Sequence, residues 1–153
     1  MNAKPKAQPP AIDNRRARYE YEILESLEAG VVLTGTEVKS IRAGGASLSE
    51  AYARFREGEA WLLGMHVPAY KQGSFSNVDP NRPRKLLLHR EQIDRLQSRV
   101  GEKGLTIVPL RLYFTRGIAK VQLGLARGKK QWDKRAAVAK RDVEREIARF
   151  GKR

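Results

Sequence analysis

The stretch LTIVPLRLYFTRGIAKVQLGLA, residues 105–126, decides the expected fold. Apolar residues alternate with others on both sides of a turn at 115–117, as they do in strands that have one buried face. The alternating positions are Val108, Leu110, Leu112 and Phe114 before the turn, and Ala119, Val121, Leu123 and Leu125 after it. Two such runs joined by a short turn that contains glycine predict an antiparallel β-hairpin.

Shorter alternating patterns earlier in the sequence predict more strands. Tyr19, Tyr21 and Ile23 alternate along one strand, and Gly30 permits a reversal into a second short strand at 31–35. Two alternating runs within 51–65 predict a further hairpin, because a Glu-Gly pair separates them.

Two segments have helical spacing. Thr36 can cap a short helix at 36–45, and residues 89–104 place Ile93, Leu96 and Val100 on one face. The seventeen residues 69–85 show no periodicity, and loops of that length in compact domains tend to be functional or disordered.

About six short strands and two helices, without regular strand–helix alternation, predict a mainly β fold with flanking helices. We expect an OB-like, closed or partly closed antiparallel barrel with short helices and a basic C-terminal tail. The expected boundaries are a disordered arm at 1–14, the barrel at 15–126 and the tail at 127–153. The tail has only a thin apolar stripe, so we expect it to be disordered when free and helical on a partner.

Charge points to the class of partner. Lys and Arg number 31 against 17 Asp and Glu, which leaves a net charge of +14. The net charge is +4 over residues 1–18, +3 over 19–126 and +7 over 127–153. Basic termini on a nearly neutral body favour nucleic acid as the partner, with an anionic membrane as the weaker alternative.

Enzymatic chemistry has little support in the sequence. Cysteine is absent, and neither of the two histidines lies in a metal-ligand pattern. No G-x-S-x-G motif surrounds a serine, and GLARGKK at 124–130 departs from the spacing of a P-loop. We therefore expect no catalytic residues, metal or cofactor, no membrane span, and a cytoplasmic location.

The segment GKKQWDKR, residues 128–135, combines cations with one large aromatic side chain. Lys129, Lys130, Lys134 and Arg135 can neutralise phosphates, while Trp132 can stack on an unpaired base. The alternative is that the tryptophan packs against the edge of the barrel beside a solvated basic run. Asp133 has a physical reason to be there as a cap of a tail helix.

Three segments together resemble the SmpB family of bacterial SsrA-binding proteins. They are NRRARYEYEILESLEAGVVLTGTEVKSIRAG from residue 14, RKLLL at 84–88 and GLARGKKQWDKR at 124–135. The resemblance implies an OB-like barrel that binds the tRNA-like domain of tmRNA, and a tail that enters the decoding centre and the empty mRNA path of a stalled ribosome. The implied partners are tmRNA, rRNA of the small ribosomal subunit, and elongation factor Tu with GTP through alanyl-tmRNA. The family's proteins are not enzymes.

The resemblance also implies roles for particular residues. The expected tmRNA-binding residues are Asn14, Glu28, Lys39, Arg42, Leu87 and Lys120. The expected ribosome-facing residues are Tyr19, Gly128, Lys129, Lys130, Trp132, Asp133, Lys134 and Arg135.

Two of these roles have plain alternatives. Glu28 can be an ordinary solvated glutamate, and Leu87 can be a core residue. Tyr19 and Trp132 stand where many relatives carry histidine, so a stacking ring remains there but an imidazole proton does not. A ribosomal protein whose tail threads rRNA and an RNA-processing enzyme are the competing functions.

Overall fold

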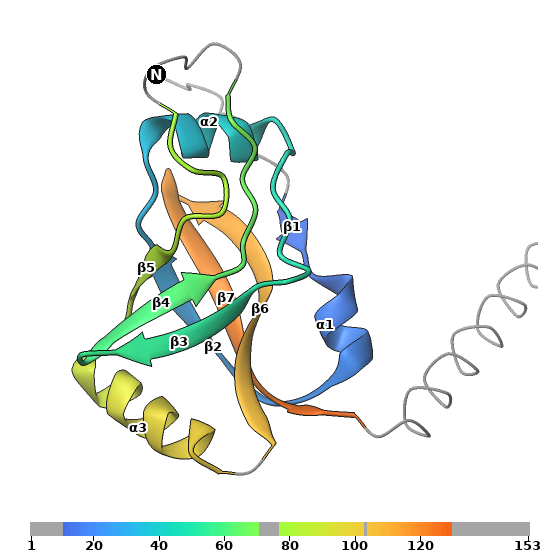
Figure 1. The fold of residues 1–153 in the computed structure, drawn as a ribbon, viewed down its shortest axis with the longest axis vertical. Coiled ribbons are helices and arrows are strands. Elements are labelled where there is room, and N and C mark those ends of the chain that lie inside the picture. The colour runs from blue at the N-terminus through green and yellow to red at the C-terminus, as the bar shows by residue number, and fades with distance from the viewer. Residues whose placement is uncertain (1–10, 71–76, 103, 130–153) are drawn as a thin grey trace, which may run out of the picture.

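Antiparallel strands make up most of the fold in the computed structural model, which describes residues 11–70, 77–102 and 104–129 (Figure 1). The strands are β1 (Ile12–Asp13), β2 (Tyr21–Val31), β3 (Tyr52–Arg56), β4 (Glu59–Leu63), β5 (Arg84–Leu87), β6 (Leu105–Thr115) and β7 (Ile118–Gly128). The helices are α1 (Arg15–Glu20), α2 (Gly35–Arg42) and α3 (Arg90–Val100).

The sheet curls into a ring. Its order is β1-β6-β3-β4-β5-β2-β7, and β7 pairs again with β6. Where β3 meets β6, only Ala53 and Ile107 pair, so these two strands are joined over a very short length and the barrel is only partly closed there. The structure thus confirms the expected antiparallel, partly closed barrel with flanking helices.

The hairpin predicted at 105–126 is present as β6 and β7, but β6 has two buried faces near its start. A bulge between Pro109 and Arg111 shifts the register. Val108 and Leu110 pack with Ala17 of α1 in a small cluster of their own, whereas Ile107 and Leu112 belong to the main core. The predicted alternation placed Val108 and Leu110 on one face with Leu112 and Phe114, and this is wrong, because the bulge puts the first two on the side that α1 covers.

The other two helices cover different parts of the barrel. α3 buries Ile93 and Leu96 in the main core, which confirms the face predicted for this helix. α2 lies at the opposite end of the molecule (Figure 1) and buries Ile41. The N-terminal cap of α2 is Thr34, not Thr36 as predicted. The Thr34 hydroxyl accepts a hydrogen bond from the N–H of Glu37 at 3.3 Å, and the Glu37 carboxylate accepts one from the N–H of Thr34 at 2.9 Å.

Two predictions for the first part of the chain are wrong. Tyr19 lies in α1, not in a strand, because the buried side chain of Asn14 caps a short helix that begins at Arg15. Gly30 is not a turn either, since β2 runs without a break through it to Val31 and pairs there with both β5 and β7.

The predicted boundary of the N-terminal arm at residue 14 is also wrong. Ile12 and Asp13 pair with β6, and Asn14 is 3% exposed. The Asn14 amide nitrogen donates to the carbonyls of Leu48 and Pro109 at 3.1 and 2.7 Å, while its side-chain oxygen accepts from the N–H of Ala17 at 3.2 Å. These bonds tie the start of α1 to β6, so the ordered domain begins before Asn14.

A buried ion pair attaches α2 to β5. Arg84 is fully buried, and its guanidinium donates to Glu37 at 2.7 Å, to the Met65 carbonyl at 2.5 Å and to the Pro80 carbonyl at 3.0 Å. Burial by itself raises the pKa of Glu37, but hydrogen bonds from Arg82, the Thr34 backbone and Arg84 outweigh it and hold that pKa below its ordinary value. Glu37 therefore stays charged and holds the cap of α2 and β5 together.

Candidate nucleic-acid interface

Three of the residues expected to bind tmRNA meet on the outer face of the barrel. Leu87 of β5 lies opposite Gly30 of β2, Gly30 lies opposite Lys120 of β7, and Lys120 lies opposite Tyr113 of β6. Glu28 is two residues from Gly30 and points to the same side. We call Glu28, Gly30, Leu87, Tyr113 and Lys120 the Leu87 site.

Leu87 is not a core residue. It is 55% exposed, whereas the neighbouring Leu86 is 2% exposed and points into the barrel. A Cβ atom at Gly30 would lie 3.2 Å from the Leu87 Cβ and 3.3 Å from its Cδ1. The absence of a side chain at Gly30 therefore lets Leu87 lie against β2, at the rim of a hollow of about 660 Å³ that Glu28, Lys120 and the start of α3 also line.

The acidic side chain in this site has polar partners. The Tyr113 hydroxyl donates to Glu28, and the Lys120 ammonium lies 3.9 Å from the other carboxylate oxygen. The guanidinium of Arg111 lies 6.0 Å from the centre of the Tyr113 ring. Lys120 thus offsets part of the charge of Glu28, which reduces the repulsion between Glu28 and a phosphate backbone, while the Glu28 oxygens can still accept from base amino groups.

Tyr113 should titrate well above the ordinary range of a tyrosine. Partial burial, the hydrogen bond to Glu28 and the charge of Glu28 raise the pKa of Tyr113 to about 12. Because this pKa is higher in the folded chain than the ordinary value of 10.0, the contact stabilises the fold below pH ~10 and is lost as the pH rises towards 12.

Phenolate absorbance followed from pH 9 to 13 measures this titration. We expect a step near pH 12 that disappears in Tyr113→Phe. A titration curve of Tyr113→Phe that still contains this step would contradict the assignment.

The other expected tmRNA residues lie elsewhere. Lys39 and Arg42 are exposed on α2, where the Lys39 ammonium lies 5.8 Å from the Tyr70 ring and the Arg42 guanidinium 5.6 Å from the Phe114 ring. Neither lines the hollow of the Leu87 site. The buried position of Asn14 contradicts the expectation that its side chain faces RNA, because its hydrogen-bonding atoms are all used inside the fold.

The first residues of the expected ribosome-facing set lie at the other end of the β2–β7 ladder. Gly128 pairs with Tyr21, and the N–H of Lys129 donates to the Glu20 carbonyl at 2.9 Å. The Lys129 ammonium donates to the Arg18 carbonyl at 3.2 Å. Tyr19 is half-buried in the same short helix. We call this end of the barrel, with α1 and residues 128–129, the tail base.

The ordered barrel is longer than predicted at this end. β7 continues to Gly128, two residues past the expected boundary at 126. Lys130, Trp132, Asp133, Lys134 and Arg135 lie outside the described residues. Gly30 is nine positions after Tyr21 along β2, so the tail base and the Leu87 site are roughly 30 Å apart along the barrel.

Sequence reasoning missed Gly30 and Tyr113 as parts of the site. Tyr113 occupies an outward position of the predicted hairpin, and that alternation was the available signal. No local pattern could have placed it beside Glu28, which is 85 positions away in sequence.

In the ranges that the structure describes, no group of three or more histidine or acidic side chains is placed to hold a metal ion. Within the same ranges, no helix has both the length and the apolar character needed to span a bilayer.

Comparison with known proteins gives one consistent result. The family model described as "SmpB protein" matches residues 11–153. The SsrA-binding protein of Salinispora tropica is 60% identical over 136 residues, which cover 89% of this chain and 86% of that protein. The SsrA-binding protein of Syntrophomonas wolfei is 53% identical over 149 residues, which cover 97% and 95% of the two chains.

A solved structure described as "tmRNA-SmpB: a journey to the center of the bacterial ribosome" contains a similar chain. The TM-score is 0.68 at 56% sequence identity, and the match covers 80% of this chain and 86% of that one.

Proposed function

This chain belongs to the SmpB family, and on that premise we propose that it uses the Leu87 site for tmRNA and the tail base for the ribosome. It is a tmRNA-binding protein of trans-translation, the rescue of stalled ribosomes, and not an enzyme. The finer assignment of each surface to one partner is our proposal.

The observation that carries this assignment is the row that joins Leu87, Gly30, Lys120 and Tyr113 across four strands. Leu87, which is half-exposed and lies against Gly30, supplies an apolar contact for a nucleotide. Glu28 and Lys120 supply a hydrogen-bond acceptor and a phosphate contact beside it. Lys39 and Arg42 add backbone contacts from α2 in this proposal.

The tail base begins a second contact. Lys129 is held against α1, so the last described residue has a defined position at the tail base. We propose that the tail from Lys130 onward then enters the empty mRNA path and becomes helical there. Lys130, Lys134 and Arg135 would contact phosphates, Trp132 would stack on an rRNA base, and Asp133 would cap the helix.

The proposal has two further parts. Alanyl-tmRNA bound to this protein would reach the ribosome with elongation factor Tu and GTP. The location would be the cytoplasm, where ribosomes translate.

Removing the exposed apolar contact should weaken tmRNA binding. We expect Leu87→Ala to raise the Kd for tmRNA about tenfold or more, because truncation of a central interface residue costs about 1.4 kcal/mol or more. Filter binding at fixed salt measures the change. Ile118→Ala is the matched control, since Ile118 of β7 is 57% exposed but lies outside the hollow. Equal losses in the two variants would contradict a specific role for Leu87.

A further inference from the structure

The outer face of β3, β4 and β5 carries a tryptophan among cations. Arg54 of β3 lies opposite Trp61 of β4, and Trp61 lies opposite Lys85 of β5. The neighbours of Trp61, Ala60 and Leu62, are fully buried, so the indole is on the outside of the barrel. We call Arg54, Arg56, Trp61 and Lys85 the Trp61 face.

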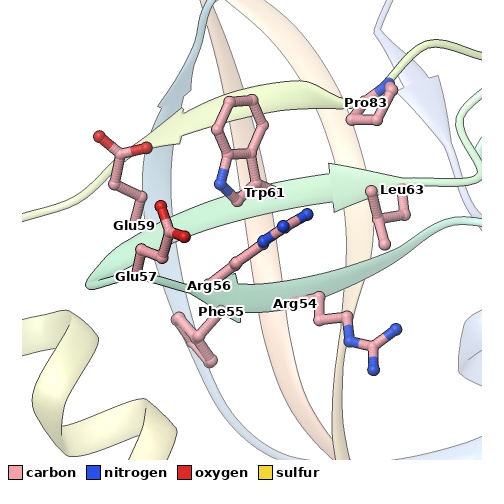
Figure 2. A pocket seen from close by; sticks show the side chains of 8 residues that line it. All are labelled: Arg54, Phe55, Arg56, Glu57, Glu59, Trp61, Leu63 and Pro83. Carbon is pink, nitrogen blue, oxygen red and sulfur yellow. The ribbon is translucent and has the colours of Figure 1, made fainter.

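The Trp61 face is hollowed and accessible. Trp61 lines a depression of about 680 Å³ together with Arg54, Arg56 and Leu63. Figure 2 shows the indole standing out from β4, with Arg56 extended across the sheet towards it and Arg54 pointing away at the edge of β3. A half-buried indole that takes no part in the core is available as a flat surface for a ligand.

The two arginines of this face have no ion-pair partner within the part of the chain that the structure describes. Four arginines elsewhere in the fold each form an ion pair. They are Arg90 with Asp94, Arg95 with Glu25, Arg16 with Glu20 and Arg111 with Asp13. The Lys85 ammonium lies 3.1 Å from a carboxylate oxygen of Glu59, so these two charges offset each other. Glu57 lies at the turn between β3 and β4, at the edge of the face. The centre of the face therefore offers free guanidinium groups beside an aromatic ring.

The Trp61 face is continuous with the Leu87 site. Lys85 and Leu87 are two residues apart on β5 and point to the same side, and Glu59 lines both hollows. With strands about 4.8 Å apart and two residues spanning about 6.7 Å, the backbone at Trp61 is roughly 8 Å from that at Leu87. A polynucleotide held at Leu87 can reach Trp61 without a change in the protein.

We propose that Trp61 is a stacking platform for an unpaired base of the same tmRNA that the Leu87 site binds, with Arg54 and Arg56 contacting the phosphates that flank this base. The inference rests on the proposed function of the Leu87 site. Free arginines select a polyanion, and the indole selects an exposed base, because every base has a flat face but a base inside a duplex does not present it. Stacking on Trp61 extends the contact beyond the Leu87 site to one more nucleotide.

Intrinsic fluorescence tests the stacking without any change at position 61. The chain has two tryptophans, so in a Trp132→Phe reference protein Trp61 is the only one. We expect a transcript of the tRNA-like domain of tmRNA to quench this fluorescence with the same midpoint as binding measured by filter retention. Saturation with RNA without quenching would overturn the proposal.

Substitutions in the reference protein test the contribution to affinity. Stacking on an aromatic side chain predicts a Kd about 10-fold higher for Trp61→Leu but within about 3-fold for Trp61→Phe. Arg54→Gln should weaken binding more than Arg15→Gln, a charge-matched change on α1. Thermal unfolding followed by circular dichroism confirms that each variant is folded. Equal affinities of the leucine variant and the reference, or equal losses for leucine and phenylalanine, would overturn the proposal.

The two proposals fail in different ways. If the unchanged protein does not bind the transcript, the proposed function of the chain is wrong. If it binds, and Leu87→Ala weakens binding while Trp61→Leu does not, only the Trp61 platform is wrong.

Discussion

Replacing Arg84 with methionine is expected to lower the free energy of unfolding by about 3–5 kcal/mol, because it leaves the buried carboxylate of Glu37 without its fully buried cationic partner. Arg84 is 0% and Glu37 3% exposed, so water cannot replace the lost contact. The Met65 carbonyl loses its bond from Arg84 as well, while the Pro80 carbonyl keeps a bond from the Val67 N–H. Arg82, which also bonds Glu37, is more exposed and compensates only in part.

Urea denaturation followed by circular dichroism measures this loss. The matched control is Lys85→Met, one residue along β5, because Lys85 and Glu59 form an exposed ion pair. Exposed pairs contribute about 0–1 kcal/mol, so the control should be nearly as stable as the unchanged protein. A similar decrease in the free energy of unfolding in both variants would show that the buried ion pair contributes no more to stability than the exposed one.

Removing the chain after Lys129 should abolish tagging of stalled nascent chains and leave tmRNA bound. The Leu87 site lies roughly 30 Å from the cut, since the two ends of the β2–β7 ladder, at Tyr21 and Gly30, are nine positions apart along β2. The loss of tail charge should weaken tmRNA binding by no more than about tenfold at physiological salt, because nonspecific phosphate contacts are screened there.

The structure sets the position of this cut. Ending the chain at 126 would remove Gly128, which pairs with Tyr21, and Lys129, which bonds the Glu20 carbonyl. A loss of tagging in that shorter chain could come from a damaged barrel. In a full-length control with Lys130, Lys134 and Arg135 changed to Gln, we expect tagging to fall while the barrel is unchanged. Normal tagging by the chain that ends at Lys129 would refute the role of the tail.

Most elements that depend on local pattern were predictable. The β6–β7 hairpin, the β3–β4 hairpin and α3 follow from alternation, turn residues and helical spacing, since each is stabilised by neighbours in sequence. The resemblance to a family supplied Glu28, Leu87 and Lys120 as site residues, and the structure brings them together, although their contact with RNA stays a prediction.

By itself, the sequence determined the two hairpins, the uneven charge and the family. Only the tertiary structure decided which apolar residues are outside. Leu87 within KLLL and Trp61 within AWLL have the same local pattern as core residues, and their exposure depends on which face of the sheet turns inward when the ring closes. Asn14 shows the reverse: a polar residue of an apparent arm is buried because β6 and residue 48, both distant in sequence, supply its hydrogen-bond partners.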